Sequence, residues 1–127
     1  MVSTIEAARI AARKILESTY NGVATVIEHQ KVKDEKTHVT SCEDVTVLEG
    51  QACKLSYSSI NTVIQSKSAA NVIQTIKLFI SPDITIKPGS KIVITQAGVT
   101  NEYTYSGVPA VYETHQEIML EYFKEWA

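Results

Sequence analysis

The hydrophobic pattern of the chain changes its period near residue 22. Before that point the apolar residues recur at helical spacing, at Ile5, Ala8, Ala12, Ile15 and Leu16. The run begins with a capping box over residues 3–6, a hydroxyl followed three residues later by Glu, and ends at the helix-stop pair of residues 21–22. The pattern predicts a helix from about Thr4 to Thr19 within an N-terminal segment 1–21. The apolar stripe of this helix is thin and Ala-rich. It could pack on the chain's own β domain or on a neighbouring subunit.

From residue 22 onward the pattern is typical of strands and turns. Val, Ile and Thr together supply 40 of the 127 residues, and such β-branched side chains favour pleated sheet. Alternation and turn residues predict eight short strands: Val23–Lys33, Thr37–Ser41, Val45–Glu49, Cys53–Tyr57, Val72–Ser81, Lys91–Ala97, Glu102–Ser106 and Ala110–Glu113.

The last segment fits two periods. Ile118, Leu120 and Tyr122 alternate as in a strand, whereas Met119, Tyr122, Phe123 and Trp126 make a helical stripe. Periodicity alone slightly favours a helix for residues 116–126.

A polar stretch from Ser58 to Asn71 separates the early strands from the central one. It contains four serines, two asparagines and a single charged residue, Lys67. Segments of this length without clear structure are uncommon inside compact domains and are usually functional or disordered. We therefore expect a functional loop over 58–71.

Composition sets the class of protein. With 127 residues, 44% hydrophobic and 20% charged residues, the chain is long enough for one folded domain, 1–127, and is not largely disordered. Its net charge of -2 lacks the basic footprint of a free-standing nucleic-acid binder. No apolar run approaches the ~20 residues of a membrane span, and charges are spread through the first 20 residues, so we expect no membrane contact and a cytoplasmic site of synthesis.

The sequence offers little chemistry. His38 and Cys42 are four residues apart and Cys53 follows eleven residues later, which is too sparse for a zinc site. Carboxylate pairs such as residues 34–35 and 43–44 have no nucleophile beside them, and no phosphate-binding loop or nucleophile motif is present. We expect no catalytic residues, no metal and no cofactor, and interpret the chain as an assembly or binding module.

The order of several short segments resembles a known family. These segments are residues 75–80 (TIKLFI), 84–92 (ITIKPGSKI), 105–109 (YSGVP) and 115–121 (HQEIMLE). Together with the N-terminal helix and the long polar loop, they resemble the head-closure proteins of tailed bacteriophages and prophages, also described as stoppers, head–tail connector proteins or minor capsid proteins. The resemblance covers nearly the whole chain and is most specific from Thr75 to Trp126.

The resemblance implies a mainly β fold, a small closed or partly open β-barrel over 22–127 with an N-terminal α-helix and a long loop before the central strand. It also implies that Ile118–Phe123 form a barrel strand. Such proteins have no catalytic activity. They form a homo-oligomeric ring, usually a dodecamer, in the neck of the virion, and they assemble in the host cytoplasm. The ring closes the DNA-filled head, with the portal–adaptor protein above, and tail terminator or other tail proteins below.

In the family, the loop before the central strand can project into the channel and make passive contact with packaged double-stranded DNA. The matching candidate gating residues are Ser59, Ile60, Asn61, Thr62, Val63, Ile64, Gln65, Ser66, Lys67 and Ser68. Only Lys67 offers a phosphate contact, so this lining would not grip DNA tightly.

Three alternative functions stay open at this point. One is a tail terminator or another neck or tail completion protein. Another is a small oligonucleotide-binding-type barrel, which needs an aromatic platform and a positive groove that the sequence does not show. The third is a small enzyme or ligand-binding barrel, for which the sequence shows no site.

Overall fold

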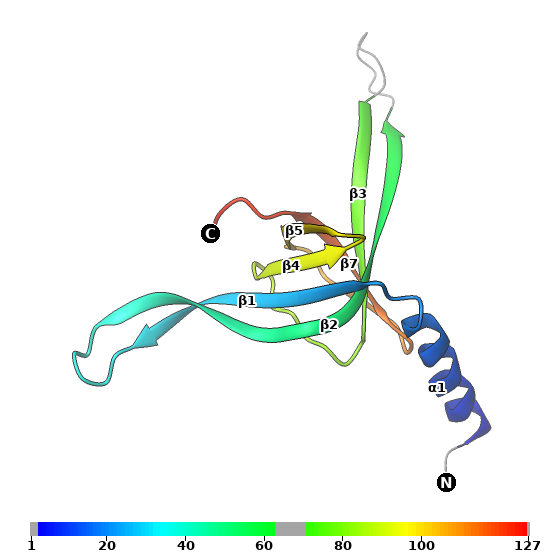
Figure 1. Cartoon of the computed structure of the whole chain (residues 1–127), viewed down its shortest axis with the longest axis horizontal. Coiled ribbons are helices and arrows are strands. Elements are labelled where there is room, and N and C mark those ends of the chain that lie inside the picture. Colours follow the sequence, from blue (N-terminus) through cyan, green and yellow to red (C-terminus); the bar gives the residue numbers. More distant parts are fainter. Residues whose placement is uncertain (1–2, 63–70, 127) are drawn as a thin grey trace.

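The computed structural model describes residues 3–62 and 71–126, which form one helix and seven strands (Figure 1). These elements are α1 (Thr4–Glu17), β1 (Gly22–Lys33), β2 (Thr40–Thr62), β3 (Asn71–Ile80), β4 (Lys91–Gln96), β5 (Val99–Thr104), β6 (Ala110–Val111) and β7 (Gln116–Tyr122). Within the described ranges, no helix is long and apolar enough to span a membrane.

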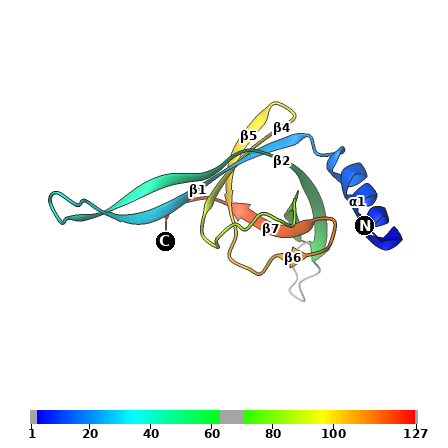
Figure 2. The same cartoon turned by 90° about the horizontal axis from the view of Figure 1, so that it is seen from below.

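The seven strands make one antiparallel sheet in the order β3-β2-β1-β4-β5-β7-β6. Because β7 also pairs with β3, the sheet curls back on itself into a partly closed ring (Figure 2). The joint between β5 and β7 consists of two residue pairs, so the ring is not a regular barrel. The mainly β fold with an N-terminal helix is thereby confirmed.

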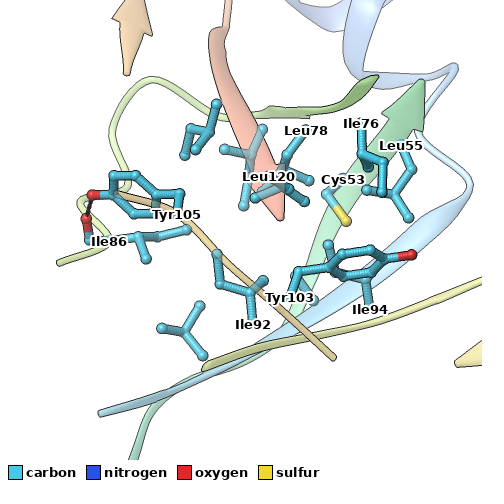
Figure 3. Packing of buried hydrophobic residues seen from close by; sticks show 14 residues of the cluster. Cys53, Leu55, Ile76, Leu78, Ile86, Ile92, Ile94, Tyr103, Tyr105 and Leu120 are labelled. Carbon is cyan, nitrogen blue, oxygen red and sulfur yellow. Dashed lines mark hydrogen bonds between the residues drawn. The ribbon is translucent and has the colours of Figure 1, made fainter. Parts of the chain in front are cut away.

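Alternation along the strands explains the core. Ile92 and Ile94 of β4 are 0% and 1% exposed, and Ile118 of β7 faces the same interior at 1%. Tyr103 and Leu78 belong to the same buried cluster, and Figure 3 shows Ile92 and Ile94 beside Tyr103 in it. Each fully buried Leu or Ile contributes roughly 1.5–3 kcal/mol relative to an exposed one, so the ring is the stable part of the chain.

Two buried polar side chains fix the irregular connection between β3 and β4. The Gln116 amide nitrogen donates to the carbonyl oxygen of Ser81 at 2.8 Å, and also to that of Ile84. The hydroxyl of Tyr105 donates to the carbonyl oxygen of Ile86 (Figure 3). These bonds satisfy backbone groups that the sheet cannot reach, and they hold the connection against the ring.

The prediction of separate strands at Val45–Glu49 and Cys53–Tyr57 is wrong: β2 is one continuous strand of 23 residues. Opposite β1, the register skips from Gln51 to Leu48 and again from Leu48 to Thr46. Gly50 takes a φ of 63°, a conformation that glycine adopts without strain. The extra residues are therefore absorbed as β-bulges, which bend a strand without ending it.

The helical preference for residues 116–126 is also wrong, and the strand implied by the family resemblance is confirmed over Gln116–Tyr122. Ile118 and Leu120 are buried, whereas Met119 and Tyr122, which belong to the alternative helical stripe, are each 51% exposed. The segment follows the two-residue period of a strand because β7 pairs with β3 through five consecutive residues and closes the ring.

The N-terminal helix is confirmed, ending at Glu17 rather than near Thr19. The backbone N–H of Glu6 donates to the Ser3 hydroxyl at 3.1 Å, which is the predicted N-cap.

Candidate interaction site

A hairpin of β2 and β3 projects beyond the ring (Figure 1). On its far side β3 pairs with β7 only from Ile76 to Ile80, so the pairs from Ser58↔Thr75 to Thr62↔Asn71 lie past the rim. Five paired residues at about 3.3 Å each give this projection a length of roughly 16 Å before its tip. We call residues 58–62 and 71–75 the β2–β3 projection.

The predicted loop 58–71 is therefore too long. Ser58–Thr62 and Asn71 belong to paired strands, because the strand period continues through this polar sequence. Of the candidate gating residues, Ser59, Ile60, Asn61 and Thr62 lie at the end of β2. Val63, Ile64, Gln65, Ser66, Lys67 and Ser68 lie outside the described residues.

The base of the projection rests on a tyrosine pair. The hydroxyls of Tyr57 and Tyr103 are 3.2 Å apart, and the ring of Tyr103 stacks on that of Tyr122 at 5.3 Å. Burial, reinforced by the hydrogen bond to Tyr57, raises the pKa of Tyr103 to about 12. The phenol is therefore neutral at physiological pH, and the described residues of the projection carry no formal charge.

A second hairpin leaves the ring on another side. The far halves of β1 and β2, residues 28–33 and 40–45, pair with each other and extend away from the other strands (Figures 1 and 2). Every residue from Thr40 to Asp44 is exposed. We call residues 28–45 the β1–β2 arm. The predicted strand Val23–Lys33 is present, the predicted strand Thr37–Ser41 begins later, at Thr40, and the sequence does not predict that the arm stands clear of the ring.

The helix α1 is the third projecting element. Its apolar stripe does not pack on the ring, since Ile5 and Ile15 are 64% and 70% exposed. Polar contacts tie it down instead: Arg13 donates to Asp83 at 2.9 Å and to the Ser81 hydroxyl, and Arg9 pairs with Glu113 at 2.6 Å. Of the two partners left open by the sequence, the chain's own β domain does not cover the stripe.

The candidate chemical residues do not gather into one place. In the described ranges, no three His, Cys, Asp or Glu side chains are placed to hold a metal. Cys42 is exposed on the arm, whereas burial raises the pKa of the Cys53 thiol to about 12. Glu117 accepts from His115 at 2.9 Å and pairs with Lys77 at 2.9 Å, and both contacts lower its pKa. The Glu117 carboxylate is therefore already paired with His115 and Lys77.

These features define a small, partly closed antiparallel β ring that carries three projecting elements and little polar chemistry. No protein-family model matches the chain, and no curated protein matches it. Among solved structures, its fold is similar to that of the phage-like element PBSX protein xkdH from Bacillus subtilis. The identity is 10%, the match covers 79% of this chain and 91% of that chain, and the TM-score is 0.46.

Proposed function

We propose that this chain is a structural protein of the phage head–tail connector. Copies of it form a ring below the portal and adaptor that closes the DNA-filled head and receives the tail. The carrying observation is the β2–β3 projection, a long paired hairpin without formal charge in its described residues, mounted on a compact ring. The order of segments that resembles the head-closure family supports the same function.

The proposal follows from the size and chemistry of the projection. In a ring of copies with this hairpin turned inward, several projections of roughly 16 Å meet near the axis and obstruct it by volume. A lining rich in Lys and Arg would instead bind each phosphate and hold DNA in place. The described residues of the projection include no Lys or Arg for such binding, so the closure is reversible when the tail attaches. The protein then acts by geometry, without a catalytic step.

Heads filled with DNA and carrying portal and adaptor test the proposal. In one variant, residues 59–74 are replaced by Asn-Gly, which shortens the hairpin to its pair Ser58↔Thr75. We expect wild-type protein to protect the packaged DNA from nuclease. The shortened variant should still bind the heads but leave the DNA exposed.

A matched control keeps the hairpin and removes its charge. Lys67→Ser should close the heads as wild type does, because closure by volume needs no phosphate contact. Protection by the shortened variant would show that the hairpin is not the plug. Binding of wild-type protein to tail tubes and not to heads would favour the tail-terminator alternative.

A further inference from the structure

The β1–β2 arm has two open backbone edges. β4 accompanies β1 only as far as the pair Ile27↔Lys91, and β3 joins β2 only from Cys53 onward. Within the described residues, no strand lies beside β1 over 28–33 or beside the outer side of β2 over 40–52. Such edges present unpaired N–H and C=O groups and are templates for an added strand.

The two edges carry opposite charge. From Thr40 to Glu49, β2 contains the carboxylates Glu43, Asp44 and Glu49 and no lysine or arginine. Over 28–33, β1 exposes Lys31 and Lys33, and its single carboxylate, Glu28, lies 3.7 Å from Lys87. Like charges directly opposite each other across two strands are destabilising. Pairing of β1 with β1 or β2 with β2 is thus disfavoured, and pairing of β1 with β2 of another copy is favoured.

An open groove runs along the β1 edge. It has a volume of about 620 Å³ and is lined by Glu28–Lys31, by the turn Lys87–Ser90 and by Trp126, which stacks on His29 at 4.9 Å. Successive residues of β1 line it although their side chains point to opposite faces, so the groove follows the edge of the strand. It begins next to Lys91, the first residue of β4, where an added strand would continue the sheet along β1.

We propose that the β1–β2 arm joins copies of this chain head to tail, the β1 edge of one copy pairing with the β2 edge of the next. Because β1 and β2 are antiparallel within the arm, copies in the same orientation bring these edges together as antiparallel strands. Such a heterologous contact closes into a ring when its rotation divides a full turn. The inference rests on the proposed ring and assigns its interface.

Two charge-reversed variants test this inference. Lys31→Glu with Lys33→Glu makes both edges acidic, and Glu43→Lys with Asp44→Lys makes both edges basic. We expect each variant alone to associate about tenfold more weakly than wild type, because residues 31 and 33 of one edge and residue 44 of the other, which lie on the same face of the sheet, then carry like charge. An equimolar mixture should regain wild-type association, since every contact then joins an acidic edge to a basic one. Sedimentation velocity over a concentration series at low ionic strength measures this.

The control is Lys14→Glu with Lys124→Glu, which changes the net charge by the same amount as Lys31→Glu with Lys33→Glu, at exposed positions outside the arm. It should associate as wild type does, and urea unfolding of all variants checks that each is folded. Wild-type association of either charge-reversed variant, or a mixture that stays dissociated, overturns the inference. If wild type associates only on portal–adaptor particles, the same samples are compared there. Rings that form there regardless of the arm charges would refute the edge pairing alone, whereas wild type that forms none would refute the proposed function as well.

Discussion

Ile118 and Met119 are neighbours on β7 whose side chains point to opposite faces of the sheet. Ile118 is 1% exposed and lies in register with Leu78 of β3, which is 0% exposed. Met119 is 51% exposed and lies in register with Lys77. Truncating each to alanine therefore tests whether β7 is a strand that closes the ring.

We expect Ile118→Ala to lower the free energy of unfolding by about 2–5 kcal/mol, because it removes buried methyl groups and leaves a cavity beside Leu78. Met119→Ala should cost less than about 1 kcal/mol, the usual range for half-exposed positions. A domain of this kind has a total stability of about 5–15 kcal/mol, so the first change removes a large share of it.

Urea unfolding followed by tryptophan fluorescence and circular dichroism measures both changes. With slopes of about 1–3 kcal/mol per molar urea, a loss of 3 kcal/mol moves the midpoint by about 1–3 M. The slope itself should stay constant. A helix over 116–126 would bury Met119 and expose Ile118, so losses of equal size or in the reverse order would refute the strand and the closed side of the ring.

Three further outcomes follow from the described contacts. At neutral pH a thiol reagent should label Cys42 rapidly and Cys53 only after unfolding, because burial raises the pKa of Cys53 to about 12. His115 and Lys77 lower the pKa of Glu117 from 4.5. The ionised carboxylate therefore stabilises the fold above about pH 4.5, and this stabilisation is lost as the pH falls through the folded-state pKa. In Glu117→Gln the urea midpoint should decrease less than in wild type between about pH 6 and about pH 3. Arg13→Met should reduce helical circular dichroism, since an isolated helix of 14 residues is marginal, while the free energy of unfolding of the ring falls by less than about 1 kcal/mol.

The parts of the fold that the sequence predicts well are those in which one period fits alone. Ile76, Leu78 and Ile80 alternate in β3, and Ile92 and Ile94 alternate in β4, and all five are buried. The capping residues of α1 are equally local, because an N-cap involves only the first turn.

Other parts depend on pairings between distant residues. Gly50 looks like a turn in the sequence, but β1 pairs with β2 on both sides of it and keeps the strand continuous. The projecting lengths of both hairpins depend on where β3, β4 and β7 end. Ile27 is the last residue of β1 beside β4, and nothing in the sequence of β1 itself marks that point.

The exposed apolar stripe of α1 is a further case. Helical spacing predicts a helix with an apolar face, but it cannot tell which surface covers that face. Arg13 sets the orientation of α1 by binding Asp83 and the Ser81 hydroxyl, which are far away in the sequence. Ile5 and Ile15 therefore stay exposed in the single chain.

The ring also determines how the arm is presented. A free two-stranded hairpin is marginally stable in water, and the arm has no buried residue of its own. However, β1 and β2 continue from the arm into the ring, where buried Val26 lies opposite Leu48 and fixes their register. The ring thus orders the edges in the single chain, which would lower the entropy lost in the proposed pairing of copies. Mutations such as Ile118→Ala should consequently weaken the fold without changing association of the folded chain, whereas charge reversal on the arm should do the opposite.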